Sequence, residues 1–199
     1  LCKIYHEDDD YFREFNISQN LKVGEFGKLE NILHFADDNS IINLTQNYTY
    51  SIGFDTIDNI GIEHSNLTIN GNGYTINALD QSFPIYITRL DNINISNCNF
   101  MGKMSFSVVN MTNFNFINCS FINSFASLKC VDTGTVHIID SSFDNSGFDD
   151  SSNDGACEFS QCDNVIIENS NFTNIHNYYG TIFLVNNKAN LISGCIFNN

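Results

Sequence analysis

The segment Leu90-Asp-Asn-Ile-Asn-Ile-Ser-Asn-Cys-Asn-Phe100 decides the fold, because the chain repeats it. The next copy is Met111-Thr-Asn-Phe-Asn-Phe-Ile-Asn-Cys-Ser-Phe121. Other copies before and after these close on the same aromatic position, which is occupied in turn by Tyr74, Phe100, Phe121, Phe143, Phe172 and Phe197. A unit of constant pattern, separated from the next by loops of variable length, is the sequence pattern of a solenoid.

Apolar and polar residues alternate within each copy. The position five residues before the closing aromatic residue holds Ile69, Ile95, Phe116, Ile138, Ile167 and Ile192. The position seven residues before it holds Leu67, Ile93, Phe114, Val136 and Val165. This period of two predicts a β-strand with one buried face. In the last copy Asn190 takes the apolar position and Leu191 stands beside it, which predicts a break in the strand register there.

Two turn positions follow each of these strands. The first holds residue types that tolerate a left-handed backbone, namely Gly71, Asn97, Asn118, Asp140, Asn169 and Gly194. We expect a left-handed bend at each of them. The second holds Asn72, Cys98, Cys119, Ser141, Ser170 and Cys195, which are small enough to point into a narrow corner. Stacked thiols at Cys98 and Cys119 are therefore expected to pack as small apolar groups rather than to form a redox site.

A second apolar run follows each closing aromatic residue, as in 106–109 and 128–131, so each coil carries at least two strands. Parallel strands joined by short bends wind in one sense, and the right hand is the expected one. Near the start of the chain, residues 26–36 have the apolar spacing of a short helix. The sequence thus predicts an all-β fold, a right-handed parallel β-helix, with a short N-terminal helix that caps the first coil.

Two regions follow from this pattern. Residues 1–49 are expected to form an N-terminal cap and the first strand, and residues 50–199 the parallel β-helix coils. The repeat stops in mid-pattern at residue 199, without a second cap, so we expect the chain to be a fragment of a longer protein.

The charge balance argues against two classes of partner. Eight basic residues against 23 acidic ones give a formal charge of −15, which repels nucleic acid and anionic lipid surfaces. No apolar stretch reaches the roughly 18 residues of a membrane span. Neutral ligands or cations suit this chain better.

The repeats resemble a known group of proteins. Residues 29–50, with their helix, acidic turn and Ile41-Ile-Asn-Leu44 strand, resemble the N-terminal segment of pectate-lyase-like β-helix proteins. Residues 66–76 and 93–100, with the later copies, resemble adhesin-like proteins of methanogenic archaea and, more distantly, bacterial polymorphic outer-membrane proteins. The resemblance covers about residues 26–199. It implies display on the cell surface and a role in attachment, with a carbohydrate or a surface protein of another cell as the partner.

The residues needed for polysaccharide chemistry do not form a recognisable set. A lyase needs a base and a group that neutralises a carboxylate, but Arg13, Arg89 and the six lysines recur on no common face. A hydrolase needs paired carboxylates, and no acidic pair with a neighbouring His stands out. Gly53-Phe-Asp55 matches an epimerase motif only weakly, since Ile52 precedes it where Tyr is expected. We expect a non-catalytic module; a polysaccharide lyase or hydrolase, or its remnant, and a structural stalk remain the alternatives.

One segment could bind a metal. The acidic insertion 144–155 contains glycine and many oxygen-bearing side chains, the ligand type that Ca²⁺ prefers. Its candidate ligands are Asp144, Asp149, Asp150 and Asp154, although a solvated acidic loop explains the same composition. No other cofactor is expected.

Overall fold

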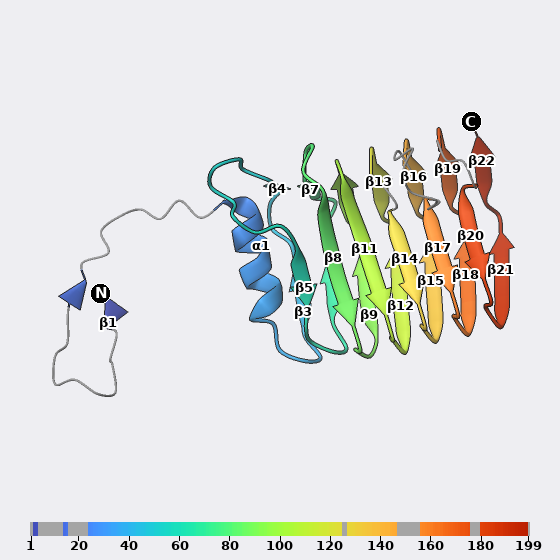
Figure 1. Ribbon diagram of the computed structural model, residues 1–199, viewed down its shortest axis with the longest axis horizontal. Helices are drawn as coiled ribbons and strands as arrows, with labels where there is room; N and C mark the ends of the chain where they lie inside the picture. The colour runs from blue at the N-terminus through green and yellow to red at the C-terminus, as the bar shows by residue number, and fades with distance from the viewer. Residues whose placement is uncertain are drawn as a thin grey trace.

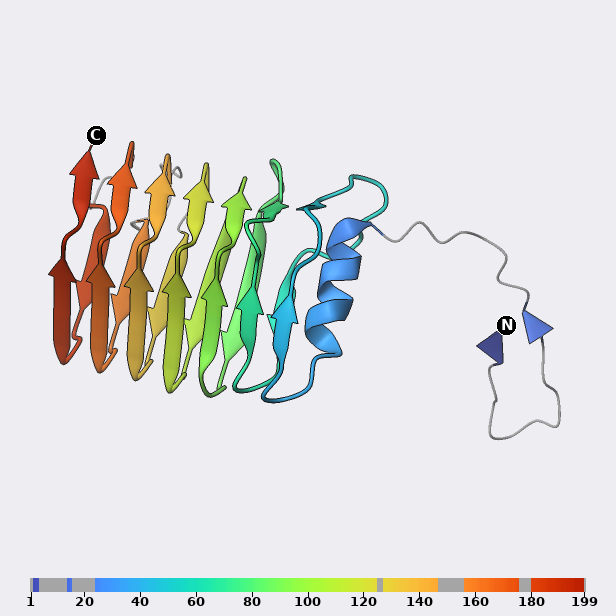
Figure 2. The same ribbon diagram turned by 180° about the vertical axis from the view of Figure 1, so that it is seen from behind.

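The computed structural model describes residues 2–3, 14–15, 24–124, 127–146, 156–175 and 180–198. Three parallel sheets, with seven, seven and six strands, run along the molecule, because each coil adds one strand to each sheet. Figures 1 and 2 show the coils stacked along one axis, with helix α1 (Glu25–His34) against the first coil. The predicted all-β parallel β-helix with a short helix near its N-terminus is confirmed.

The strands of each coil follow one another in a fixed order of sheets. The first sheet contains β3 (Ile41–Asn43), β6 (Thr68–Asn70), β9 (Ile93–Ser96), β12 (Asn113–Ile117), β15 (Thr135–Ile139), β18 (Asn164–Glu168) and β21 (Ala189–Ser193). The second contains β4 (Tyr48–Thr49), β7 (Thr75–Asn77), β10 (Asn99–Met101), β13 (Ser120–Ile122), β16 (Ser142–Asp144), β19 (Asn171–Thr173) and β22 (Ile196–Asn198). The third contains β5 (Ile60–Ile62), β8 (Phe83–Thr88), β11 (Met104–Val109), β14 (Leu128–Val131), β17 (Cys157–Ser160) and β20 (Ile182–Val185). Separately, β1 (Cys2–Lys3) pairs antiparallel with β2 (Glu14–Phe15).

The core consists of ladders of equivalent side chains. Phe121 pairs in register with Phe100 on one side and Phe143 on the other. The ring centroids of these neighbours lie 5.0 and 4.9 Å apart, close to the spacing of adjacent strands. The same stacking continues through Phe172 to Phe197. Pairing of the backbone thus stacks the closing aromatic residues that the repeat predicts.

The first copy departs from the predicted alignment. Ile76, and not Tyr74, pairs with Phe100, because the turn after β6 is two residues longer than in later coils. The left-handed residues of this turn are Asn72 and Gly73 rather than Gly71, and Asn72 is exposed. Gly71 serves a different purpose, since a Cβ there would lie 2.4 Å from the carbonyl oxygen of Asn97.

The later coils follow the turn prediction. The five residues Asn97, Asn118, Asp140, Asn169 and Gly194 all adopt left-handed conformations, with φ between 50° and 63°. The predicted register break in the last coil is wrong. Asn190 pairs with Val165 and the flanking residues of β21 stay in step with β18, because the backbone ladder fixes the register whatever side chain stands there.

The stacked cysteines are packing residues. Cys98 and Cys119 are buried free thiols, as expected. The hydrogen bond between the two thiols, together with burial, raises the pKa of Cys98 above its ordinary value. Both side chains are almost completely buried, which suits small apolar packing residues.

Helix α1 covers the open end of the first coil. Phe26, Leu29 and Leu33 are buried against it, whereas Ile32 is 40% exposed. The helix begins one residue before the predicted 26–36 range and ends two residues before its end. Phe26 packs edge-on against Phe83 with 4.6 Å between the ring centroids.

Two carboxylates fix this helix to the coil. Asp55, which is only 6% exposed, accepts hydrogen bonds from the backbone N–H of Gly27 at 2.9 Å and of Ser51 at 2.7 Å. Glu25 accepts one from the N–H of Thr49 at 2.7 Å. A carboxylate at a helix N-terminus satisfies free N–H groups and interacts favourably with the helix dipole. The weak epimerase-like match at 53–55 therefore has a structural explanation.

Truncation of the aromatic ladder should lower the stability of the fold substantially. Phe121→Ala removes a fully buried ring that stacks on both sides, so we expect the free energy of unfolding to fall by about 3–5 kcal/mol. The matched variant Ile117→Ala, on the outer face of the first sheet, should cost less than about 1 kcal/mol. Urea denaturation of both variants measures the difference. Equal losses would contradict the ladder as the main source of stability.

Removal of the Asp55 carboxylate should loosen the cap. Asp55→Ala leaves the N–H groups of Gly27 and Ser51 without their acceptor, so we expect a loss of about 2–3 kcal/mol. Hydrogen exchange should then speed up in α1 before it does so in the central strands. Asp58→Ala, a change at an exposed acid a few residues away, is the control and should shift stability by less than about 0.5 kcal/mol.

Candidate functional site

The three turns of a coil differ in how much their lengths vary. Turns from the first to the second sheet are constant after the second coil, at 97–98, 118–119, 140–141, 169–170 and 194–195. Turns from the second to the third sheet vary widely, at 78–82, 102–103, 123–127, 145–156 and 174–181. We call this last set the variable corner. In solenoids, insertions collect on the face that binds ligands, so this corner is the natural place to look for a site.

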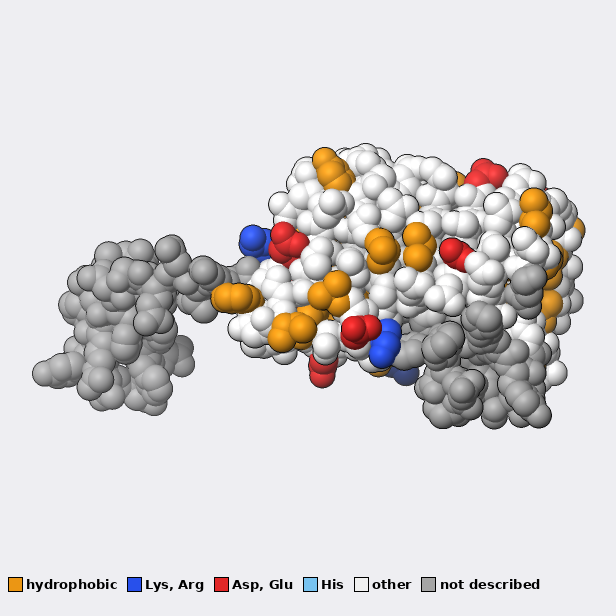
Figure 3. All heavy atoms as spheres, turned by 90° about the horizontal axis from the view of Figure 1, so that it is seen from above, with side chains coloured by type: hydrophobic (Ala, Val, Ile, Leu, Met, Phe, Trp, Pro, Cys, Tyr) orange, Lys and Arg blue, Asp and Glu red, His pale blue; other side chains and the backbone are white. Residues whose placement is uncertain are grey.

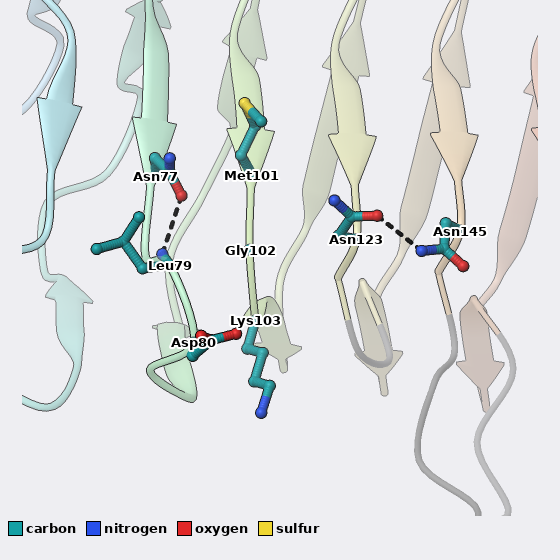
Figure 4. Close-up of a pocket in the computed structure, with 8 residues that line it drawn as sticks. All are labelled: Asn77, Leu79, Asp80, Met101, Gly102, Lys103, Asn123 and Asn145. Atoms are coloured by element: carbon teal, nitrogen blue, oxygen red, sulfur yellow. Dashed lines mark hydrogen bonds between the residues drawn. The ribbon is translucent and has the colours of Figure 1, made fainter.

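A groove of about 450 Å³ lies at the variable corner, between the short turn 102–103 and its longer neighbours. Figure 4 shows the residues that line it, which are Asn77, Leu79, Asp80, Met101, Gly102, Lys103, Asn123 and Asn145. They come from four successive coils. A ligand in this groove would therefore lie along the axis of the solenoid.

The floor of the groove depends on Gly102. This residue has a φ of 75°, and a Cβ on it would lie 2.3 Å from the carbonyl oxygen of Leu79. Only glycine permits both the left-handed conformation and so close an approach of two backbones. Because Gly102 has no side chain and its turn is short, a hollow opens between the neighbouring coils.

Two amides in the wall are held in defined orientations. The Oδ1 atom of Asn77 accepts a hydrogen bond from the N–H of Leu79 at 2.9 Å. The Oδ1 atom of Asn123 accepts one from Nδ2 of Asn145 at 2.7 Å. The bond from Asn145 leaves Nδ2 of Asn123 on the side that faces Met101 and Gly102 (Figure 4), and the bond from Leu79 fixes the orientation of the Asn77 amide. The groove thus presents preoriented donors to a ligand.

Charge in the groove is limited to Asp80 and Lys103 among its lining residues. Figure 4 shows the Asp80 carboxylate directed across the groove toward residue 103, while the side chain of Lys103 extends away from it. The surface seen from above in Figure 3 carries few charged side chains and is mostly uncharged. The arrangement supplies hydrogen-bonding groups rather than a strong electrostatic field.

Several other polar side chains on the surface form hydrogen bonds with one another. Hydrogen bonds of 2.7 to 3.2 Å between side-chain amides form two asparagine ladders. One contains Asn43, Asn70, Asn97 and Asn118, and the other contains Asn66, Asn92 and Asn113. On the third sheet, Lys129 forms an ion pair of 2.8 Å with Glu158. Groups that already have partners gain less from a ligand, which favours the groove as the binding site.

The predicted calcium ligands are only partly placed. Asp144 ends β16 at the variable corner, where its Oδ1 atom accepts a hydrogen bond from Nδ2 of Asn174 at 2.9 Å. Asp149, Asp150 and Asp154 lie outside the described residues. Within the described ranges no group of three His, Cys, Asp or Glu side chains could hold a metal ion. Calcium binding therefore stays a prediction.

The sequence located the insertion at 144–155 but not the groove. No motif marks the groove, because its lining residues are scattered from 77 to 145 and meet only through the coil geometry. The available signal was the contrast in turn length between coils. This contrast can be measured only when all three strands of each coil are known.

Comparisons with known proteins point to the fold and no further. No protein-family profile and no curated protein matches the chain. A solved structure from Parabacteroides merdae, described as a "putative glycosyl hydrolase", is similar with a TM-score of 0.56 and 13% sequence identity, over 79% of this chain and 80% of that one. Within the described parts of the chain, no helix is long and apolar enough to cross a membrane. At this level of identity the similarity shows a shared β-helix fold.

Proposed function

We propose that the chain is a non-catalytic, glycan-binding β-helix module of a cell-surface protein, and that the groove over Gly102 is its binding site. The observation that carries this proposal is the groove at the variable corner, with its oriented amides and a single carboxylate, Asp80, among its lining residues. The resemblance to adhesin-like proteins supports the surface location and the role in attachment.

The groups in the groove suit the hydroxyls of a sugar. Each hydroxyl is both a donor and an acceptor, so it pairs with an amide Nδ2 and with a carboxylate at once. Asn77 and Asn123 supply the former and Asp80 the latter. A volume of about 450 Å³ is within the range of small-molecule sites. The lining residues come from four successive coils, which suits an extended chain of sugars.

The net charge of the protein limits the classes of glycan that it can bind. A formal charge of −15 disfavours polyanionic glycans such as polyuronates, whose approach would be repelled. A neutral glycan meets no such barrier.

The absence of a second carboxylate in the described lining favours binding over hydrolysis. Glycosidases use two carboxyl groups, about 5 to 9.5 Å apart, on either side of the scissile bond. The described lining supplies Asp80 alone, and Lys103 extends away from the groove. The alternative function is that of a polysaccharide-active enzyme, which the name of the structural neighbour favours.

Binding is tested first on a glycan array and then by calorimetry with a ligand that the array identifies. We expect Asp80→Asn and Asn123→Ala each to weaken binding about tenfold, the effect of losing one good hydrogen bond. Asn115→Ala, which removes an amide from the outer face of the first sheet, is the control and should leave affinity unchanged.

Two outcomes would contradict the proposal. An intact chain that binds no glycan on the array would favour the structural stalk. Release of new reducing ends or unsaturated uronates from a polysaccharide panel would favour the enzyme, all the more so if Asp80→Asn abolished the turnover.

We further propose that the acidic insertion binds Ca²⁺ weakly through Asp144, Asp149, Asp150 and Asp154. Extracellular calcium modules have dissociation constants of about 10⁻⁴ to 10⁻³ M, so millimolar Ca²⁺ should raise the melting temperature. Asp144→Asn should reduce that rise. No heat in a calorimetric titration and no shift in melting temperature would exclude the site.

A further inference from the structure

The outer face of the first sheet carries a diagonal stripe of aliphatic side chains. Strands β12, β15, β18 and β21 lie side by side in this sheet (Figure 1). Their backbone register places Ile117 opposite Ile139, and Ile166 opposite Leu191. Ile166 is opposite His137, two residues before Ile139, so the second pair continues the first one obliquely. We call the four aliphatic residues of these two pairs the aliphatic stripe.

The aliphatic stripe differs from the rest of this face. From β6 to β18 the other outward residues of the sheet are Asn, Ser or Thr, apart from His137 and Glu168. Ile117 is 38% exposed and Leu191 is 49% exposed. A single pair of β-branched residues is explained by the modest stability that it adds to neighbouring strands. A band of apolar side chains across four coils of an exposed face is instead typical of a surface that contacts another protein.

One titratable side chain flanks the aliphatic stripe on each side. His137 lies beside the second pair of the stripe, and Glu168 lies beside the first pair. Among the described outward residues of the first sheet, these two alone titrate. A hydrogen bond of 2.7 Å joins Nδ1 of His137 to Oδ1 of Asn115, and Oε1 of Glu168 accepts one from the hydroxyl of Ser193 at 3.1 Å. Each flanking side chain is therefore held by a neighbour in the sheet.

This arrangement makes the face complementary to itself. A two-fold axis that runs along the aliphatic stripe, in the plane of the face, places the stripes of two copies against each other. His137 and Glu168 lie on opposite sides of that axis, so the rotation puts His137 of each copy over Glu168 of the other. Such a contact is isologous, because the same surface serves both copies and every contact occurs twice.

We propose that the chain associates with a second copy of itself through the outer face of the first sheet, with the aliphatic stripe at the centre and His137 opposite Glu168 of the second copy. The distribution of charge supports this face. A formal charge of −15 makes two copies repel each other, but this face has one acidic residue, and the contact with His137 compensates for it.

The size of the face limits the strength of the association. Seven strands about 4.8 Å apart, with about 3.3 Å for each of five residues, give a face of roughly 30 by 16 Å. This area is at the small end of the range for specific interfaces, so we expect a weak and reversible dimer.

The groove stays accessible in this dimer. Its lining residues lie on the second sheet and in the turns from the second to the third sheet, away from the first sheet. The dimer therefore carries two grooves. If the groove binds glycans as proposed above, the dimer binds a multivalent glycan surface more tightly than one copy does.

Sedimentation equilibrium of the intact chain tests the association. We expect a reversible equilibrium between monomer and dimer at micromolar concentrations. Ile139→Asn and Ile166→Asn should each raise the dissociation constant at least about tenfold, because each change occurs twice in the dimer. Val131→Asn, a change at a half-buried outward aliphatic residue of the third sheet, is the matched control and should leave the dissociation constant unchanged. Circular dichroism of the dilute variants checks that each is folded.

A reversal of charge tests the predicted pairing. His137→Glu places two carboxylates against each other at two points of the dimer, so it should weaken association about tenfold. Addition of Glu168→Lys to this variant reverses the pair and should restore association. Addition of Asp58→Lys instead gives the same net charge, but this exposed residue lies outside the face, so association should stay weak.

The results separate the parts of the inference. A chain that stays monomeric up to millimolar concentration would overturn it. A dimer that both isoleucine substitutions leave unchanged would use another surface, which would overturn it equally. Equal recovery by Glu168→Lys and Asp58→Lys would show that net charge alone controls association, and would overturn the pairing of His137 with Glu168. These measurements contain no glycan, so their failure leaves the proposed function untouched.

Discussion

Parallel pairing of each coil with the next is the constraint on which the rest of the structure depends. The backbone hydrogen bonds hold equivalent residues about 4.8 Å apart, so each position of the repeat becomes a ladder along the axis. Inside, this spacing stacks Phe100, Phe121, Phe143 and Phe172. Outside, it places asparagines where their amides bond from coil to coil. At the bends, it requires the same left-handed conformation again and again, which the repeat meets with Asn, Asp or Gly.

The sequence predicts those ladders well where the repeat length is constant. From Phe100 onward, the alternating strand and the Asn or Gly bend locate the buried faces and the turns without any knowledge of the structure. The first copy was misaligned because its turn is two residues longer. An insertion of two residues preserves the alternation of apolar and polar positions, so Tyr74 and Ile76 fit the pattern equally well. At the other end, Asn190 breaks the pattern of side chains but not the pairing of the backbone.

The groove could not be predicted, and the reasons are physical. It arises from a missing side chain at Gly102 and from the different lengths of neighbouring turns, and neither produces a motif. Sequence periodicity revealed two strands in each coil, whereas the position of the variable corner depends on the third. Asp55 illustrates the opposite case. Its neighbours suggested catalysis, but its carboxylate holds the N-terminus of α1, a contact between residues that the sequence does not link.

The division between constant and variable turns has a consequence for how such a protein can change. The other two corners settle to a constant length, from 97–98 onward between the first and second sheets and from 110–112 onward between the third and first sheets. At the third corner, the chain lengthens from two residues at 102–103 to the whole of 145–156 while the flanking strands stay paired. The length of this corner is therefore independent of the residues that form the ladders. A lineage that carries this scaffold can reshape one edge by insertion, and with it the proposed binding groove, while the strands on either side stay paired.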